Sequence, residues 1–576
     1  MENREFSRVF SQIADILEIQ NENIFRIRSY RNAAQVLESV TFNIYKTALE
    51  KPEAIKELPG VGAAIFAKIL EICQTGVCAE HQRLLVAVPL SLLEMARLPS
   101  VGPKKVALFQ KHQIANLDEL AEAARRQKLR DLPGIGEKTE QRILKAIEER
   151  RRAAADFRLS DALQTAERLT DYLTASCRFQ QISLAGSLRR WKETVADIDV
   201  LVAAKEAAPV MQSFVQFGAI DQVLAQGETK SSVLLSSGMQ ADLRVLAPES
   251  FGTALQYFTG SKEHNVALRE RAKGLGYKVS EYGVFRGSDG SPVAGATEED
   301  VYHLLGLQFI PPELRENSGE IEAAARSALP RLIEEADIRG DLHMHTLESD
   351  GKHTLEQMAA AAHQRGYQYI AITDHSRSVA IASGLDAARL LRQLEQIRNW
   401  ETKKSVPVHI FAGAEVDILA DGTLDFEDSV LEQLDIVIAS IHSRMNMPLE
   451  EMTRRICRAL ENPNVTILAH PTGRLLRRRP PYAVDLDAVF ETARRHSVAL
   501  ELNAYPARLD LNDVHCRKAQ QLGIAIVISS DSHHVEMLGH IRYGVHTARR
   551  GWLGPEHVLN TRPLEEMKAY LGLSAE

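Results

Sequence analysis

The chain has 576 residues, of which 45% are hydrophobic and 25% are charged, and its formal net charge is −8. This length predicts several domains with separate cores, and the composition excludes a disordered chain. Five cysteines argue against a disulfide framework. No apolar run reaches the roughly 20 residues of a membrane span, and the first residues carry no signal-peptide pattern. We therefore expect a cytoplasmic protein with no membrane partner, and the acidic charge does not exclude DNA because binding depends on the local basic surface.

The amino-terminal region is predicted to be helical and contains one short motif three times. The copies, at residues 58–62, 98–102 and 132–136, each end in a turn that predicts a helix-hairpin-helix. Glycines in such a turn let backbone N–H groups approach a phosphate without reading bases. A single copy is more often a structural hairpin, but three favour DNA binding, although the second copy has Ser100 where the others have glycine. The predicted DNA-binding glycines are Gly60, Gly62, Gly102, Gly134 and Gly136.

Three aspartates predict a metal site in the next region. Asp197 and Asp199 alternate with apolar residues, so a strand would point both carboxylates to one face. Asp242 lies in a second alternating run, residues 240–245, which could pair beside the first strand. Two like charges so close need a cation, and divalent ions held by carboxylates are what phosphoryl and nucleotidyl transfer require.

A short stretch before these aspartates is suited to binding phosphate. Gly186 and Ser187 would open a helix, where free N–H groups and Arg190 can hold a triphosphate. An isolated pair of aspartates is usually a surface feature near a turn. The combination of glycine, serine, arginines and a third strand carboxylate makes that interpretation the minority one.

The run Tyr257-Phe258-Thr259-Gly260, followed by Asn265 and Arg269, completes a pattern that resembles the polymerase core of family X DNA polymerases. The resemblance implies that Asp197, Asp199 and Asp242 are catalytic and hold two Mg²⁺ or Mn²⁺ ions. It also implies that dNTPs are substrates and that the nucleotide-binding residues are Gly186, Ser187, Arg190, Tyr257, Phe258, Gly260, Asn265 and Arg269. Trp191 replaces a small residue of the family pattern.

The first hairpin resembles the small lyase domain of the same family, which grips a 5′-phosphate at a gap. Lys68 falls at the position of that family's Schiff-base lysine and is also a predicted DNA-binding residue. An amine nucleophile would need a depressed pKa. A solvated helix lysine is the alternative, and the sequence leaves 5′-deoxyribose-phosphate lyase activity open.

The carboxy-terminal part is predicted to be a βα barrel with a metal site. Apolar strands alternate with amphipathic helices, and one strand after another ends in histidine, aspartate or glutamate. In such a barrel the carboxyl ends of the strands form the site. One histidine after a strand is usually structural, but six strand ends with the same chemistry favour metal binding.

This part resembles a polymerase and histidinol phosphatase (PHP) domain. The resemblance implies an active phosphoesterase with about three Mn²⁺ or Zn²⁺ ions, and Asp374 and Asp417 are expected to orient imidazoles rather than to bind metal. The implied ligands are His343, His345, Asp350, His375, Glu415, His442, His470, Asp531 and His533.

The predicted fold is multidomain: a helix-hairpin-helix region, an α/β nucleotidyltransferase palm with a small α/β thumb, and a distorted βα barrel. The expected boundaries are 1–85 (lyase-like, 5′-phosphate-binding), 86–155 (DNA-binding hairpins), 156–246 (palm), 247–314 (dNTP selection), 315–337 (linker) and 338–576 (PHP). We expect a monomer that binds gapped or primer-template DNA and dNTPs, fills gaps in DNA repair, and acts on DNA ends as a 3′–5′ exonuclease. Abasic-site endonuclease and 3′-phosphatase are further candidate activities.

Two alternatives to this function remain. One is a phosphoesterase that processes DNA ends and whose polymerase core only holds DNA, and the other is a DNA-binding scaffold without enzymatic activity.

Overall fold

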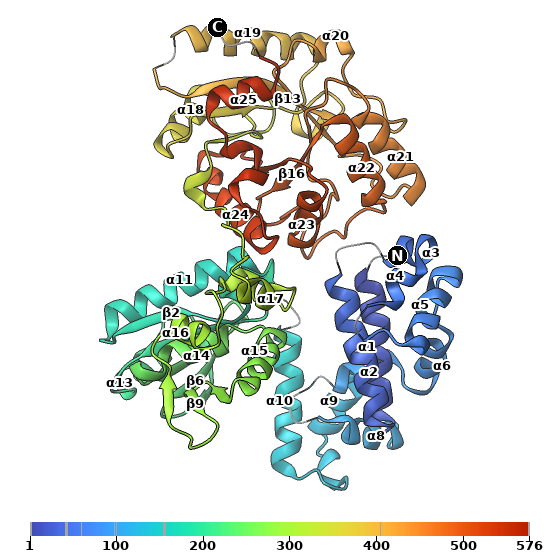
Figure 1. The fold of residues 1–576 in the computed structure, drawn as a ribbon, viewed down its shortest axis with the longest axis vertical. Coiled ribbons are helices and arrows are strands. Elements are labelled where there is room, and N and C mark those ends of the chain that lie inside the picture. The colour runs from blue at the N-terminus through green and yellow to red at the C-terminus, as the bar shows by residue number, and fades with distance from the viewer. Residues whose placement is uncertain are drawn as a thin grey trace. The chain divides into compact units, whose positions relative to one another are not determined.

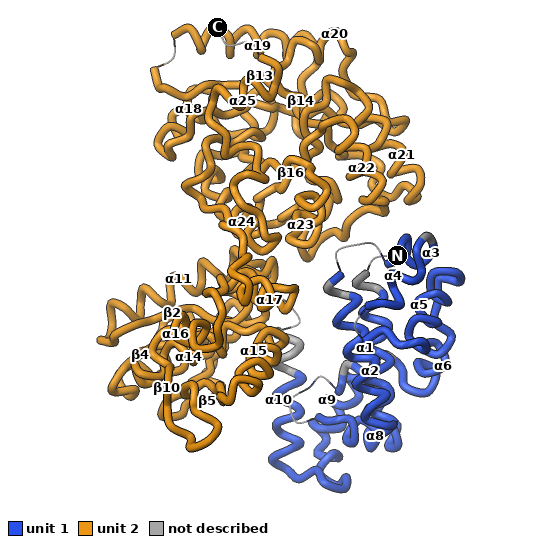
Figure 2. Tube along the Cα trace, viewed as in Figure 1, with its two compact units in different colours: residues 1–155 blue, residues 156–576 orange. Residues whose placement is uncertain are grey.

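The computed structural model describes residues 3–40, 44–58, 60–96, 98, 101–153, 157–403 and 405–573. The chain divides into two compact units, residues 1–155 and residues 156–576 (Figure 2). None of the described helices is long and apolar enough to cross a membrane.

The first unit is helical, and its core is built from the apolar stripes of amphipathic helices. Phe6, Phe10 and Ile13 of the first helix are fully buried, at the helical spacing of one face. The helices are α1 (Asn3–Ile19), α2 (Ile24–Ser39), α3 (Ile44–Glu50), α4 (Pro52–Lys56), α5 (Ala63–Thr75), α6 (Ala79–Ala87), α7 (Leu90–Ala96), α8 (Pro103–Lys111), α9 (Leu117–Arg125) and α10 (Glu137–Ala153). This part of the predicted fold class is confirmed.

The palm is a five-stranded mixed sheet in the order β2-β4-β7-β6-β5. Figure 1 labels two of its strands, β2 and β6, and the helices α11 and α13 of the same domain. β4 and β7 are parallel and adjacent, whereas the other pairs are antiparallel. Its elements are β1 (Phe157–Arg158), α11 (Leu159–Ser176), β2 (Gln181–Leu184), α12 (Gly186–Arg189), β3 (Thr194–Val195), β4 (Asp197–Ala203), α13 (Ala208–Val215), β5 (Ile220–Gln226), β6 (Lys230–Leu235) and β7 (Gln240–Leu246).

The thumb follows the palm and combines three helices with a small antiparallel sheet, β10-β9-β8. Its elements are α14 (Phe251–Thr259), α15 (Lys262–Gly274), β8 (Tyr277–Ser280), β9 (Gly283–Arg286), β10 (Pro292–Ala294) and α16 (Glu298–Leu304). The segment expected as a linker contains α17 (Glu320–Ala325), and Ile321, Ala324 and Leu332 pack into the thumb core. Much of this segment is therefore packed structure.

The carboxy-terminal domain is a seven-stranded parallel sheet whose strands follow in chain order from β11 to β17. A parallel bridge between Met344 and Ser532 links the segment after β11 to the segment after β17, so the sheet nearly closes into a barrel. Each crossover carries helix or loop outside the sheet, as parallel pairing requires. The predicted distorted βα barrel is thus confirmed.

The barrel's elements are β11 (Gly340–Asp341), α18 (Leu355–Gln364), β12 (Tyr369–Ile372), α19 (Ala387–Lys403), β13 (His409–Asp417), α20 (Asp428–Leu431), β14 (Ile436–Ser440), α21 (Leu449–Leu460), β15 (Ile467–Leu468), α22 (Leu486–His496), β16 (Ala499–Asn503), α23 (Asp513–Gln521), β17 (Ile526–Ser529), α24 (Ile541–Arg550) and α25 (Leu564–Tyr570).

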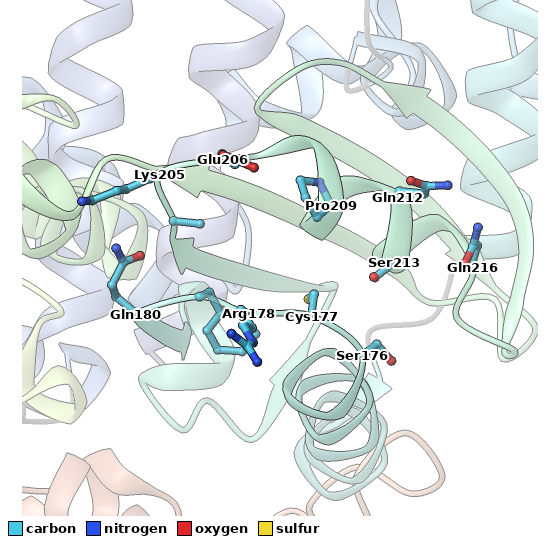
Figure 3. A pocket seen from close by; sticks show the side chains of 12 residues that line it. Ser176, Cys177, Arg178, Gln180, Lys205, Glu206, Pro209, Gln212, Ser213 and Gln216 are labelled. Atoms are coloured by element: carbon cyan, nitrogen blue, oxygen red, sulfur yellow. The ribbon is translucent and has the colours of Figure 1, made fainter.

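An open pocket of about 750 Å³ lies on the palm between the end of α11 and α13 (Figure 3). Cys177, Arg178, Lys205 and Gln216 are among its lining residues. Lys205 follows the carboxyl end of β4, whereas Asp197 begins that strand. The pocket is therefore at the opposite end of β4 from the aspartates.

Candidate active sites

The palm sheet brings the three predicted catalytic aspartates together. β4 and β7 pair in parallel, with Asp199 opposite Asp242 and Asp197 opposite Gln240. Residues two apart on a strand share a face, so all three carboxylates lie on the same side of the sheet. Asp242 accepts a hydrogen bond from Gln240 Nε2 at 2.8 Å and lies 3.2 Å from Lys230 Nζ.

These carboxylates are costly to ionise together. Burial, followed by the charges of Asp197 and Asp242, raises the pKa of Asp199 to about 7. Burial and the charge of Asp242 also raise the pKa of Asp197. A cation relieves such repulsion, and clustered carboxylate oxygens are the ligands that Mg²⁺ and Mn²⁺ prefer. The donor set fits a divalent ion.

Gly186 opens α12 directly against this cluster, and a side chain does not fit there. Its φ is +62°, and a Cβ would lie 2.5 Å from Asp199 Oδ2. We expect Gly186→Ala to displace the carboxylate and to slow nucleotide insertion about 100-fold, since a shift of about 1 Å at a reacting centre has that effect. Single-turnover insertion into a one-nucleotide gap measures the change.

The matched control is Gly218→Ala, because Gly218 is an exposed palm glycine and a Cβ added there would meet nothing within 4 Å. It should insert at the wild-type rate. If Gly186→Ala inserts nucleotides at the wild-type rate, the position of the Asp199 carboxylate beside Gly186 is not required for the reaction.

Arg190 follows α12, and its guanidinium already has two partners. Nε donates to Glu316 Oε1 at 3.0 Å, and an Nη donates to the carbonyl of Thr259. Thr259 ends α14, and Gly260 closes that helix with a φ of +65°. The predicted triphosphate-binding segment, which includes half-buried Ser187, is thus linked to the run of predicted nucleotide-binding residues from Tyr257 to Gly260.

The remaining predicted nucleotide-binding residues lie on α14 and α15. Asn265 is buried and donates from Nδ2 to the carbonyl of Tyr257 at 2.7 Å. Arg269 is exposed and donates from Nε to the carbonyl of Asn265 at 3.2 Å. Phe258 lies under the guanidinium of Arg244, which is 4.4 Å from the ring centroid.

The barrel brings the nine predicted ligands together at the carboxyl ends of its strands. Glu415 lies at the centre: its carboxylate is 2.8 Å from His375 Nδ1 and 3.1 Å from His470 Nε2. Asp531 Oδ1 lies 3.2 Å from His345 Nε2. Three overlapping groups have ligand atoms within 4.8 Å of one another: His345 with Asp350, His375 and His533; His343 with His345 and Glu415; and His375 with Glu415 and His442.

Several of these ligand atoms are buried without a hydrogen-bond partner. Within the described part of the chain, this holds for His343 Nε2 and both ring nitrogens of His345. It also holds for His375 Nδ1 and Glu415 Oε2, which lie 2.8 Å apart but without the angles of a hydrogen bond. A buried polar atom left unpaired costs about 1–3 kcal/mol. Burial and the charges of His375 and His533 lower the pKa of His345 to about 4. For His343, His375 and His533, burial also lowers the pKa, but the neighbouring carboxylates outweigh it and raise the pKa above its ordinary value. The cluster fits metal ions.

A second layer of residues supports the ligands, and the sequence analysis missed its main member. Glu501 on β16 lies 2.7 Å from His343 Nδ1 and accepts a hydrogen bond from the backbone N–H of His470 at 2.7 Å. Its only signal in the sequence is a carboxylate inside the apolar strand of residues 499–503. Such partners fix the orientation of ligand imidazoles.

The two aspartates expected to orient imidazoles behave differently. Asp417 Oδ1 lies 3.4 Å from His442 Nδ1 and accepts from the His442 backbone at 2.9 Å. Asp374 instead accepts hydrogen bonds from Thr346 and Ser349, which hold the loop after His345, and among the described residues no histidine ring pairs with it.

The first unit contains the turns of the three predicted hairpins. Gly62 and Gly102 stand immediately before α5 and α8, and Gly136 stands before α10. Gly60 and Gly134 have φ values of +83° and +76°, which favour glycine. Ser100 of the second copy lies outside the described residues.

Lys68 on α5 is paired with a carboxylate. Its Nζ lies 2.9 Å from Glu80 Oε2, which also accepts a hydrogen bond from the Tyr30 hydroxyl at 3.0 Å. Burial lowers the pKa of Lys68, but the contacts with Glu80 and Tyr30 outweigh it, so the pKa lies above its ordinary value. A Schiff-base nucleophile needs the opposite shift.

We therefore expect Glu80→Gln to increase borohydride trapping of the chain on a 5′-deoxyribose-phosphate end. Without the carboxylate, Tyr30 alone opposes the effect of burial, so the lysine pKa should fall. A fall of one unit gives about ten times more neutral amine at a fixed pH. Glu53→Gln, at a side chain that is 76% exposed, is the control and should not change trapping. Equal, low trapping by both variants would mean that Lys68 is not a nucleophile.

The palm and thumb contact the barrel through side chains of α24. Arg550 donates to the carbonyl of Arg190 at 2.7 Å and to Glu316 Oε1 at 3.0 Å. Trp191 stacks flat on His546, with ring centroids 3.5 Å apart. Trp191, which departs from the family pattern, is thus part of the contact between palm and barrel. This contact lies next to Arg190 in the chain.

Comparison with known proteins covers most of the chain. Family models match a helix-hairpin-helix domain at residues 1–78, a SAM-like helix-hairpin-helix tandem at 92–149, the DNA polymerase beta thumb at 254–316 and a PHP domain at 341–504. The DNA polymerase/3′-5′ exonuclease PolX of Bacillus subtilis (strain 168) is 40% identical over 576 residues, which is 99% of both chains.

The barrel also has shorter relatives of its own. A probable phosphatase of Thermoanaerobacter sp. (strain X514) is 29% identical over 242 residues, covering 40% of this chain and 93% of that protein. A probable phosphatase of Shewanella sediminis is 31% identical over 233 residues, covering 39% and 89%.

Proposed function

The chain belongs to the family X DNA polymerases that carry a PHP domain, and on this premise we propose that it fills short DNA gaps and trims 3′ ends at two separate metal sites. The observation that supports this most strongly is the presence of both candidate ligand sets in one chain: three carboxylates on the palm and nine predicted ligands in the barrel, seven of which form the three candidate metal groups. We propose the domain boundaries given by the sequence, with residues 315–332 packed on the thumb.

At the palm, Asp197, Asp199 and Asp242 would hold two Mg²⁺ ions. These ions supply activation of the primer 3′-hydroxyl and charge stabilisation of the leaving pyrophosphate. Arg190 and the N–H groups of α12 would bind the triphosphate of the dNTP. To bind a phosphate oxygen, the Arg190 guanidinium would either give up its hydrogen bond to Glu316 or contact the carboxylate and the phosphate at the same time.

At the barrel, the nine side chains around Glu415 would hold about three Mn²⁺ or Zn²⁺ ions. These ions supply Lewis acidity toward a phosphodiester and lower the pKa of an attacking water. Glu501 would keep His343 in one tautomer and orientation. The probable phosphatases among the relatives support hydrolysis of phosphate esters by this domain.

The hairpin turns would bind the DNA backbone, with the first gripping a 5′-phosphate. Each candidate ligand set lies within one chain, which supports action as a monomer, and the proposed activity on DNA agrees with the cytoplasmic location that the sequence predicts. The charge pairing of Lys68 supports phosphate binding without strong lyase activity.

The test is primer extension on a one-nucleotide gap with a 5′-phosphate, in Mg²⁺ and then in Mn²⁺. We compare wild type with Asp197→Ala and His343→Ala. Asp197→Ala should lose synthesis and keep primer shortening, and His343→Ala should do the reverse, so each variant controls for the folding of the other. If wild type shortens or dephosphorylates ends but never extends them, the chain is an end-processing phosphoesterase.

A further inference from the structure

Arg508 lies beside the metal ligands of the barrel, and part of its guanidinium has no partner. Its Nε is 3.7 Å from Asp531 Oδ2, which is an ion-pair distance but too long for a hydrogen bond. Its Nη1 is buried and makes no hydrogen bond to any residue that the structure describes. The side chain is only 15% exposed. Arginine is always charged, so this nitrogen is a strong donor with no acceptor.

The backbone around Arg508 is fixed on both sides, so the position of the side chain is built into the fold. The carbonyl of Arg508 accepts a hydrogen bond from Arg474 Nε at 3.0 Å, and the carbonyl of Leu509 accepts another from the same guanidinium. Asn503 and Asp510 pair through their backbones, which ties the loop to β16. A fixed backbone limits the region that the guanidinium can reach, so less conformational freedom is lost when the side chain binds a ligand.

The nearest carboxylate does not use this donor. Asp531 is a predicted metal ligand, and its Oδ2 accepts a hydrogen bond from Asn503 Nδ2 at 3.1 Å. A guanidinium nitrogen without a hydrogen-bond acceptor at the edge of the predicted ligand cluster is suited to an anion that arrives from outside.

We propose that Arg508 binds a non-bridging oxygen of the phosphate group that the barrel hydrolyses, and so fixes the terminal phosphodiester or phosphomonoester of a DNA end. This inference rests on the proposed phosphoesterase function of the barrel and adds a phosphate-binding residue to it. The guanidinium suits this ligand because its planar donors match phosphate oxygens. The competing interpretation is that Arg508 only holds Asp531 in place for metal binding.

The test measures binding of inorganic phosphate, the simplest ligand of this chemistry, to the full-length chain loaded with Mn²⁺, by titration calorimetry. Wild type is compared with Arg508→Ala and Arg508→Lys, and with Arg495→Ala as a control at an exposed arginine on α22. Metal content per chain is measured for every sample. We expect Arg508→Ala to weaken phosphate binding roughly 10- to 100-fold, the usual effect of losing a charge-assisted hydrogen bond.

The same variant should keep the Mn²⁺ content and the primer extension of wild type. Its KM for exonuclease substrates should rise more than kcat falls, and Arg508→Lys should recover part of the phosphate affinity. A fall in Mn²⁺ content together with phosphate binding would overturn the proposal and assign Arg508 to the support of Asp531. If Arg508→Ala binds phosphate as tightly as wild type, and wild type still hydrolyses DNA ends, the role proposed for Arg508 is wrong but the proposed function of the barrel is not. A wild-type chain that neither hydrolyses DNA ends nor binds phosphate would overturn the proposed barrel function as well.

Discussion

Replacing Glu415 with glutamine is expected to abolish hydrolysis by the barrel and to lower its metal content. The Glu415 side chain is 1% exposed and lies within 3.6 Å of ring nitrogens in five histidines: His343, His345, His375, His442 and His470. It belongs to two of the three candidate metal groups. The amide keeps the shape of the side chain but removes a negative charge from both candidate groups, where it would stabilise bound cations.

Loss of an outer partner of a metal ligand alone costs 10- to 100-fold in affinity or activity, so loss of a shared ligand should cost at least about 100-fold. Exonuclease rate and metal content by plasma mass spectrometry measure the effect. Glu432→Gln, at an exposed residue of the same domain, should change neither quantity. Primer extension by Glu415→Gln should remain at the wild-type level. Full metal content in this variant would mean that Glu415 is not a ligand.

The parts of both sites that the sequence could predict are those that local pattern controls. Alternation over residues 197–200 places two carboxylates on one face of a strand, and the structure has them on β4. A run of apolar strands that end in histidine, aspartate or glutamate predicts one edge of a parallel barrel, because all carboxyl ends of parallel strands lie at that edge. The barrel confirms this fold, and the clustering of the nine ligands follows from it.

The parts that the sequence could not predict depend on tertiary packing. Lys68 and Glu80 lie on different helices, and nothing in the spacing of 12 residues requires their side chains to meet. Glu501 carries a carboxylate in an apolar strand, which indicates a buried partner but not which one. Trp191 gave no sign of its contact, because His546 is far away in the chain. In each case the partner is set by how elements pack and not by local periodicity.

Replacing Arg550 with alanine is expected to destabilise the second unit and to weaken dNTP binding, although Arg550 belongs to the barrel. Its side chain is 7% exposed and bridges two carboxylates, Glu316 at 3.0 Å and Asp513 at 2.7 Å. Burial raises the pKa of Glu316, but Arg550 and then Arg190 outweigh it and hold that pKa below its ordinary value. Without Arg550, both carboxylates would lose their most buried partner.

Breaking a fully buried ion pair costs about 3–5 kcal/mol, and the partial exposure of both carboxylates reduces this to about 2–4 kcal/mol. Urea unfolding measures the free energy, and limited proteolysis between residues 315 and 340 measures separation of thumb and barrel. The KM for dNTP should rise roughly tenfold, because Arg550 also holds the carbonyl of Arg190. Hydrolysis by the barrel should change little.

Two further variants test whether the burial and the planar geometry of Arg550 cause the expected loss of stability and of dNTP affinity. Arg542→Ala removes another ion pair between barrel and palm, but Arg542 and Glu167 are 34% and 48% exposed, so the loss should stay below about 1 kcal/mol. Arg550→Lys keeps the charge without the planar fork and should recover part of the stability and of the dNTP affinity. If Arg550→Ala lowers stability but leaves the KM for dNTP unchanged, the barrel supports the fold of the polymerase without positioning Arg190. If all three variants behave alike, the buried bridge has no special role.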